Sequence, residues 1–272
     1  MSEVYSDVRS LDGKPKEGND ECVTLVKNLT AVGWTGKWRQ GDTVVGNNSI
    51  QQGTAIATFI DGRYANQSHG NHAALYVGQV TDGIYVMDQW RSKPKIGKRF
   101  IRRKGKDAHG RFIDPSNNAD AFFVIECAMK IRHTLIVTTL GLFFQNTVHA
   151  APRNFSCPQS IPEASVRLLA PSQEWTPFVA SPLYLSGAAP ADGPPERLGV
   201  LRESSSKVNK TETTQKYSLV GTYPDGKWLR CDYGSFGEMS LAKRLPDDVQ
   251  ECTIVKKQGV HAGENQIMIR CL

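Results

Sequence analysis

The sequence predicts an α+β domain followed by a mainly β domain held by disulfides, with a signal-peptide-like segment between them. One helix-like stretch and then five strand-like runs precede residue 126, whereas seven strand-like runs with almost no helical periodicity follow residue 151. We therefore predict three parts: residues 1–126, residues 127–150 and residues 151–272.

The central segment has the pattern of a bacterial secretory signal from Met129 onward. A basic head over 130–133 precedes an apolar run over 135–144, and Val148-His149-Ala150 supplies a small-residue cleavage motif. Because such a segment normally begins an exported protein, we expect that two neighbouring reading frames have been joined. The apolar run is about half the roughly twenty residues that a membrane-spanning helix needs, so no stable membrane span is expected.

The net charge of +6 is spread along the chain and predicts no nucleic-acid-binding domain. Residues 1–126 hold 17 basic and 14 acidic residues, and residues 151–272 hold 14 and 13. The stretch 91–111 is an exception, with ten Lys or Arg against only Asp107. It is either a solvated hairpin and loop or a patch that attracts an anionic surface or wall polymer.

Four cysteines follow the cleavage motif and predict two disulfides, because an exported domain meets an oxidising compartment. Of the three possible pairings we favour Cys157 with Cys231 and Cys252 with Cys271, since the last two flank a closing hairpin. With no signal ahead of Met1, the first part is expected in the cytoplasm. The last part is expected in the periplasm after signal cleavage.

The first part begins with a helix that carries a cysteine. Over 18–29, apolar residues recur at helical spacing after an Asn or Asp cap, which places Cys22 in the first turn. There the helix dipole and the free backbone amides favour a thiolate, the form of cysteine that acts as a nucleophile.

Strands are predicted next, at 54–60, 72–78, 83–90, 99–103 and 121–125. His72 opens the second of these and Asp88 lies near the end of the third. If residues 81–83 form the turn between them, the two strands are antiparallel and His72 and Asp88 are neighbours. Cys22, His72 and Asp88 would then form a nucleophile, a general base and an orienting group.

Other candidate sites receive less support. His69 and His72 form an H-x-x-H pair, but at strand spacing they point to opposite faces and no third ligand is evident, so neither a metal nor a cofactor is expected. Trp34 and Trp38 either wall a substrate groove or pack a turn. The glycines around them lack a phosphate-loop lysine and serine, which argues against nucleotide binding.

The last part shows strand-like runs at 166–170, 182–186, 198–202, 216–222, 228–233, 252–256 and 266–272. A turn at 223–227 is predicted to join two of them into a hairpin. Residues 238–245 are a short helix or a strand, and 204–215 a polar loop or a hairpin tip. Nothing here assembles a catalytic site, so we interpret this part as a binding domain.

The order of Cys22, the strand 53–59, the strand from His72 and the polar Asp88 resembles the papain-like amidases of the CHAP and NlpC type. Within that group, residues 15–126 most resemble the small peptidoglycan amidase effectors of bacterial type VI secretion. The resemblance implies that Cys22 attacks an amide of the cell-wall stem peptide, that His72 is the base, and that Asp88 or its alternative Gln89 orients His72. It also implies delivery of the first part to a target periplasm.

The Phe155-Ser156-Cys157-Pro158 start and the core over 228–233 resemble the small signal-bearing proteins encoded beside such amidases. This resemblance implies an immunity protein that occupies the amidase groove, and so a toxin-immunity contact between residues 1–126 and 151–272. Two other interpretations stay open. One is a membrane-tethered cysteine protease or deamidase, and the other is a catalytically inactive wall-binding module that uses residues 91–111.

Overall fold

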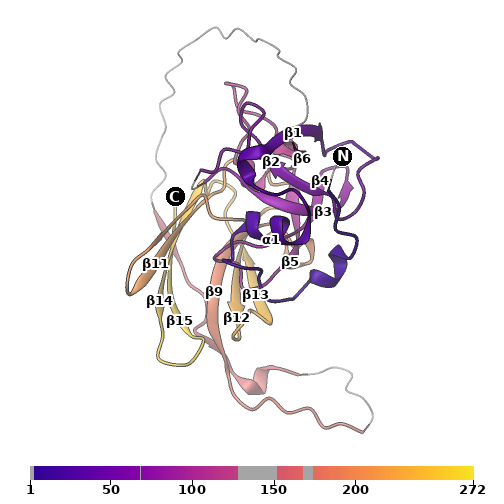
Figure 1. The fold of residues 1–272 in the computed structure, drawn as a ribbon. Coiled ribbons are helices and arrows are strands. Elements are labelled where there is room, and N and C mark those ends of the chain that lie inside the picture. The colour runs from indigo at the N-terminus through magenta and orange to yellow at the C-terminus, as the bar shows by residue number, and fades with distance from the viewer. Residues whose placement is uncertain (1–2, 68, 128–151, 168–173) are drawn as a thin grey trace.

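The computed structural model describes residues 3–67, 69–127, 152–167 and 174–272 (Figure 1). The predicted signal segment, 129–150, lies outside the described residues. Among those described, no helix is both long and apolar enough to cross a membrane. The described residues form one β-sheet before the predicted signal segment and two after it.

The first part is a six-stranded antiparallel sheet with one α-helix, in the strand order β1-β6-β2-β3-β4-β5. All five predicted strands are present, while β1 was missed because its six residues are mostly polar and only the first is buried. The elements are α1 (Cys22–Leu29), β1 (Trp38–Thr43), β2 (Ala55–Thr58), β3 (Ala73–Val80), β4 (Gly83–Asp88), β5 (Gly97–Arg102) and β6 (Phe122–Cys127). Short 3-10 turns lie at Val8–Leu11, Thr35–Lys37, Pro115–Asn117 and Ala119–Ala121.

Helix α1 lies against the sheet through a short apolar face. Its buried residues, Cys22, Leu25 and Val26, share a core with residues of β2 and β3. The predicted Asn or Asp cap is wrong: the residue before the helix is Glu21, which makes no side-chain capping bond. Asn19 instead accepts hydrogen bonds from the Glu21 amide and the Thr24 hydroxyl, so it braces the turn that leads into the helix.

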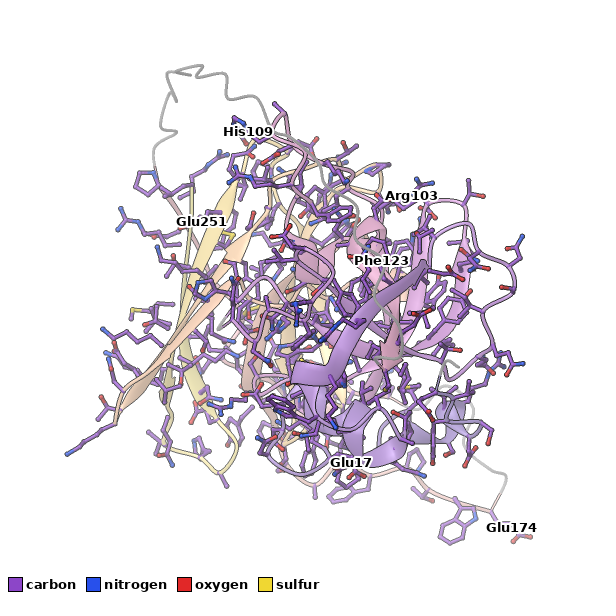
Figure 2. All side chains as sticks on the ribbon, turned by 45° about the horizontal axis from the view of Figure 1, so that its top comes forward. Glu17, Arg103, His109, Phe123, Glu174 and Glu251 are labelled. Atoms are coloured by element: carbon purple, nitrogen blue, oxygen red, sulfur yellow. A yellow bond between two sulfur atoms is a disulfide. The ribbon has the colours of Figure 1, made fainter. Side chains whose placement is uncertain are left out.

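The last part contains two antiparallel sheets, ordered β10-β11-β14-β15-β7 and β13-β12-β9-β8, around a core of its own. Figure 2 separates the two parts, with Arg103 and Phe123 beside the first sheet and Glu251 beside the strands of the last part. The strands are β7 (Arg153–Phe155), β8 (Ser160–Ile161), β9 (Leu183–Asp192), β10 (Ser205–Val208), β11 (Glu212–Ser218), β12 (Lys227–Tyr233), β13 (Met239–Arg244), β14 (Glu251–Gln258) and β15 (Asn265–Cys271), with 3-10 turns at Glu163–Ser165 and Pro195–Arg197.

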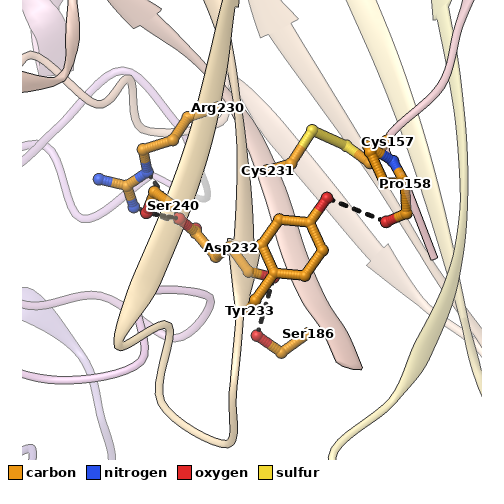
Figure 3. The surroundings of a disulfide bond; sticks show 8 residues. All are labelled: Cys157, Pro158, Ser186, Arg230, Cys231, Asp232, Tyr233 and Ser240. Atoms are coloured by element: carbon orange, nitrogen blue, oxygen red, sulfur yellow. Dashed lines mark hydrogen bonds and ion pairs between the residues drawn. A yellow bond between two sulfur atoms is a disulfide. The ribbon is translucent and has the colours of Figure 1, made fainter. Parts of the chain in front are cut away.

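Both predicted disulfides are confirmed. Cys252 and Cys271 face each other in the β14–β15 hairpin, and their sulfur atoms are bonded. Cys231 of β12 is bonded to Cys157, which lies between β7 and β8 (Figure 3). Beside this second disulfide the Tyr233 hydroxyl donates to the carbonyl of Pro158 at 2.9 Å. The segment 157–158 is therefore attached to β12 by a hydrogen bond as well as by the disulfide.

Two predicted elements of the last part are wrong, and a third is described only in part. Residues 223–226 do form a turn, but it connects β11 and β12, which pair in different sheets, so it closes no hairpin. Residues 198–202 form no strand apart from one isolated bridge at Val200, because their backbone bonds are divided among separate elements of both parts and no neighbouring strand pairs with them along their length. Residues 166 and 167 have no regular structure, and 168–170 lie outside the described residues.

Two open choices are resolved. Residues 238–245 contain strand β13 and no helix, and 204–215 hold the β10–β11 hairpin.

Candidate active site

His72 and Asp88 are in contact, as their strand positions predict. His72 immediately precedes β3, Asp88 ends β4, and the two antiparallel strands are joined through a turn that pairs Val80 with Gly83. The imidazole Nε2 lies 2.8 Å from Asp88 Oδ2, and both side chains are fully buried. The other ring nitrogen, Nδ1, is buried and has no hydrogen-bond partner among the described residues. With Nε2–H donating to the carboxylate, Nδ1 is left as the acceptor.

Two cations hold Asp88 in its ionised form. Arg99 Nε donates to Asp88 Oδ2 at 2.8 Å, and Lys93 Nζ donates to Oδ1 at 2.7 Å. Burial by itself would raise the pKa of Asp88, but Arg99, Lys93 and the bond to His72 together keep that pKa well below its usual value. A permanent carboxylate at this place fixes the tautomer of His72.

His72 is neutral near pH 7. The pKa of His72 is lowered to about 3. Burial is the main cause, the positive charges of Arg202 and Arg99 act in the same direction, and Asp88 opposes them. A neutral imidazole with one oriented and one unpartnered nitrogen has the form that a general base requires.

Cys22 makes no hydrogen bond to His72 in the described structure and is linked to this pair through Tyr64 and Asn71. It is the first residue of α1, it is buried, and its Sγ is 3.9 Å from the hydroxyl of Tyr64. That hydroxyl accepts a hydrogen bond from Asn71 Nδ2 at 3.2 Å, and Asn71 directly precedes His72. A thiol, free helix-start amides and a neutral imidazole are therefore gathered in one region, which suits attack on a carbonyl carbon.

Gln89, the alternative third residue, has a different role. Its Nε2 donates to the carbonyls of Glu17 and Glu21, and its Oε1 accepts from the Glu17 amide. These bonds connect the end of β4 to the segment that leads into α1. Of the two candidates it is Asp88 that contacts His72, while Gln89 positions the start of the helix that carries Cys22.

The basic stretch 91–111 is not a solvated surface throughout. Lys93 and Arg99 contact Asp88, Lys104 is buried against Asp114, and Arg102 is buried in a second ionic cluster described below. The prediction of a solvated hairpin is wrong for these four cations, because the fold buries each of them against a carboxylate that lies outside or at the edge of the basic stretch. A strand that alternates arginines with Phe100 and Ile101 was the available signal.

The two tryptophans have separate environments. Trp38 is fully buried in β1, donates its ring N–H to the carbonyl of Val32, and packs edge-on against Tyr64 with ring centres 5.0 Å apart. This is the predicted packing role. Trp34 is 67% exposed, and its proposed part in a groove stays a prediction. Within the residues described, the structure holds no group of three metal-ligating side chains.

The last part reaches this region through Arg202. Its Nη1 donates to the carbonyl of Asn71 at 2.5 Å and to Ser116 Oγ at 3.3 Å. Its backbone N–H donates to Asn117 Oδ1, and its carbonyl accepts from Asn117 Nδ2. The same Asn117 Oδ1 accepts from Arg99, so one chain of hydrogen bonds runs from the last part to the partner of Asp88.

A second contact between the two parts is ionic. Arg102 donates to both oxygens of Asp192 at 2.9 and 3.0 Å, and to Asp82 and Asp225 at 2.7 and 2.6 Å. Arg197 bridges Asp82 and Asp225 from the other side. We call these five residues the Arg102 cluster. Asp82 and Arg102 belong to the first part, and the other three to the last.

Comparisons with protein families divide the chain in the same way. Residues 4–125 match the family described as domesticated amidase effector 2, and residues 180–271 match that described as type VI secretion system Tli immunity protein.

Individual relatives match the first part. A type VI secretion amidase effector 2 protein of Salmonella typhi is 44% identical over 133 residues, which cover 46% of this chain and 100% of the relative. A domesticated amidase effector 2 of Ixodes scapularis is 41% identical over 111 residues, 39% of this chain and 70% of the relative. A solved structure of a type 6 secretion amidase effector 2 is 43% identical with a TM-score of 0.45, covering 48% of this chain and 98% of that one.

Proposed function

Since this chain belongs to the type VI secretion amidase effector 2 family through its first part and carries a Tli-type immunity domain in its last, we propose that residues 1–126 are a papain-like cysteine amidase. Its proposed substrates are amide bonds in the stem peptides of peptidoglycan. The observation that carries the proposal is His72, a neutral imidazole with Nε2 bonded to Asp88 and a buried Nδ1 that has no partner among the described residues. The residue before His72 bonds the Tyr64 hydroxyl, which lies 3.9 Å from the Cys22 sulfur.

The proposed reaction uses three side chains and the start of α1. His72 Nδ1 takes the thiol proton of Cys22, and the resulting thiolate attacks the amide carbonyl to form a tetrahedral oxyanion. Backbone amides at the helix start, including that of Cys22, stabilise this oxyanion. The imidazolium returns the proton to the leaving amine, and water then hydrolyses the thioester with His72 again as the base. Asp88 stays ionised and balances the charge of the imidazolium.

The last part is proposed to be the immunity protein for this amidase. Its two disulfides suit an oxidising periplasm, and the segment 127–150 is proposed to act as its export signal. The first part is proposed to remain in the cytoplasm of the producing cell until it is delivered to the periplasm of a target. In a joined chain both activities occur in one molecule.

A turbidity assay on purified peptidoglycan tests the enzyme. Residues 1–127 are suitable for testing as a separate fragment, because their hydrophobic core is separate from that of the last part. The Salmonella relative, all of which is covered by its match to this chain, has no counterpart of the last part. We expect this fragment to release new amino groups and lower the turbidity, and Cys22→Ala to abolish both effects with an unchanged fold. The matched control is Cys127→Ser, which removes the other free thiol.

The same assay separates the competing functions. An inactive wall-binding module would sediment with peptidoglycan without releasing amines, and Cys22→Ala would then behave like the parent. That function has less support, because Lys93, Arg99, Arg102 and Lys104 are committed to internal carboxylates. An active Cys22→Ala protein would refute the cysteine mechanism.

A further inference from the structure

The loop between the 3-10 turn Pro195–Arg197 and strand β10 has polar contacts with both parts, and its bonds to the first part come from Leu198, Arg202 and Glu203. The Leu198 carbonyl accepts from the Phe100 amide of β5 at 3.2 Å, and Glu203 Oε2 accepts from the Ser92 hydroxyl at 2.8 Å. Between them lies Arg202 with its contacts to Asn71, Ser116 and Asn117. A loop whose hydrogen bonds are satisfied by another domain is an interaction surface.

The backbone of this loop is held in an unusual conformation. Leu198 has φ 58°, the left-handed region that a branched apolar residue rarely occupies. Such strain persists where surrounding contacts impose it, and here the Leu198 carbonyl is bonded to β5. The residues that follow the bend include Arg202, which reaches the segment before β3, close to His72 and to Asp88 at the end of β4.

Arg202 brings a positive charge to the proposed catalytic histidine. Its guanidinium bonds the carbonyl of Asn71, the residue before His72, and its charge is among the causes that keep His72 unprotonated. The reaction proposed above passes through an imidazolium at His72. A fixed cation that interacts with that ring disfavours this intermediate.

A cavity lies between the two parts beside Arg202. A cavity of about 620 Å³ has Trp90 and Arg91 of the first part on one side and Arg202 and Glu203 of the last on the other. Arg202 Nε is buried and without a hydrogen-bond partner among the described residues, so this side chain is held by its Nη1 and its backbone. Shortening the side chain would extend the cavity toward Asn71 without removing the backbone bonds to Asn117.

We propose that residues 197–203 are the amidase-binding surface of the immunity domain, with Arg202 as the blocking residue and the Arg102 cluster as the anchor. The partner of this surface is an amidase domain of this same sequence, in the joined chain or in a second molecule. This inference rests on the proposed function and names the contact through which inhibition occurs. The blocking and anchoring roles are separate, because Arg202 contacts the site while Asp192 and Asp225 contact Arg102.

The test uses the full chain, in a Cys127→Ser background so that Cys22 is the single free thiol. We expect the full chain to hydrolyse peptidoglycan at least 100-fold more slowly than residues 1–127. Arg202→Ala and Arg202→Gln should restore at least a tenfold higher rate, and should speed alkylation of Cys22 by iodoacetamide by a similar factor. Arg244→Ala, which removes an exposed arginine of the same domain, is the matched control and should change neither rate.

A charge exchange tests the anchor separately. With the two parts supplied as separate chains, Arg102→Asp or Asp192→Arg alone should weaken inhibition at least tenfold, and the two together should recover part of it. Because a linked domain acts at high effective concentration, the same single substitutions should have little effect in the joined chain.

Three outcomes overturn the proposal. The first is a full chain as active as residues 1–127. The second is an Arg202→Ala chain that stays fully inhibited with an unchanged thermal transition, and the third is unchanged Cys22 alkylation in both Arg202 variants. If residues 1–127 are inactive but alkylation still rises in Arg202→Ala, the proposed enzyme fails while the occupancy of the site by Arg202 stands.

Discussion

The two parts of this chain use sulfur and charge in opposite ways. The first part keeps Cys22 and Cys127 as thiols and buries a charged group of Asp88, Arg99 and Lys93 beside the neutral His72. The last part joins all four of its cysteines in two disulfides around an apolar core. A buried ionic group is costly to assemble and is weak support for stability, whereas a disulfide restricts the unfolded chain directly.

This difference indicates which part of the molecule holds the reactive side chains. In the first part, buried charges fix the protonation of one imidazole. In the last part, covalent links hold the chain around the loop that carries Arg202. Changes to the charged group should therefore affect both activity and stability of the first part, and changes to the disulfides should affect the last part and the inhibition that it provides.

The largest effect is expected from Asp88. In Asp88→Asn of residues 1–127, Arg99 and Lys93 lose a buried counter-charge, which should lower the free energy of unfolding by about 3–5 kcal/mol. The catalytic rate constant should fall about 1000-fold, because His72 loses both its tautomer control and the balance of its positive form. Urea unfolding and peptidoglycan turnover measure the two effects.

Asp42→Asn is the control for this prediction, since it alters an exposed carboxylate on β1. It should leave both quantities within about 0.5 kcal/mol and twofold of the parent. If Asp88→Asn retained the parental rate constant, Asp88 would have a structural role and the orienting group would have to be sought elsewhere.

How far the sequence could predict this arrangement depended on whether one regular hairpin produces the contact. The contact of His72 with Asp88 was predictable because it is produced by one tight hairpin, and the Cys252–Cys271 pair because it closes another. Arg99, Lys93 and Arg202 were not found, since their partners come from other strands or from the other part. A run of arginines and lysines has the same composition whether it is solvated or paired, and only the tertiary fold decides.

The segment 198–202 shows a second limit of sequence reasoning. Its apolar residues Leu198, Val200 and Leu201 predicted a strand, yet its backbone partners are Phe100, Pro190 and Asn117 on different elements. The apolar residues correctly indicated that the segment is largely buried, but the sequence pattern does not reveal which elements pack against it.

Reduction of the disulfides should have the next largest effect, and in the last part alone. Loss of the Cys157–Cys231 link, 74 residues apart, should cost about 4 kcal/mol, and loss of the Cys252–Cys271 link, 19 residues apart, about 3 kcal/mol. Calorimetry of the full chain with dithiothreitol should show the transition of the last part moving to lower temperature while that of the first part stays in place.

Inhibition should weaken in the same reducing solution, because the loop around Arg202 loses its support, whereas residues 1–127 should be as active as before. The Cys127→Ser chain should show the same calorimetric shift, since Cys127 is free. Two transitions that moved together on reduction would contradict the separation of the two parts that this comparison assumes.

The smallest of the expected effects is a pH dependence carried by His72. Its pKa is about 3 in the folded chain and about 6.5 when unfolded, so below pH 6.5 the unfolded chain binds a proton that the folded chain does not. The contribution of neutral His72 is complete above pH 6.5 and is lost as the pH falls toward 3, by up to about 1.4 kcal/mol per pH unit. Asp88, whose pKa is lowered, adds its own loss of stability only below about pH 4, where its unfolded form takes up a proton.

The window between pH 6.5 and 4.5 therefore separates the effect of His72 from that of Asp88. Urea unfolding of residues 1–127 across it should give a slope that His72→Gln removes and that His109→Gln, at an exposed position, preserves. Equal slopes in all three proteins would mean that burial of the imidazole does not set the charge of His72. Buried electrostatics would then no longer distinguish the first part from the disulfide-linked last part.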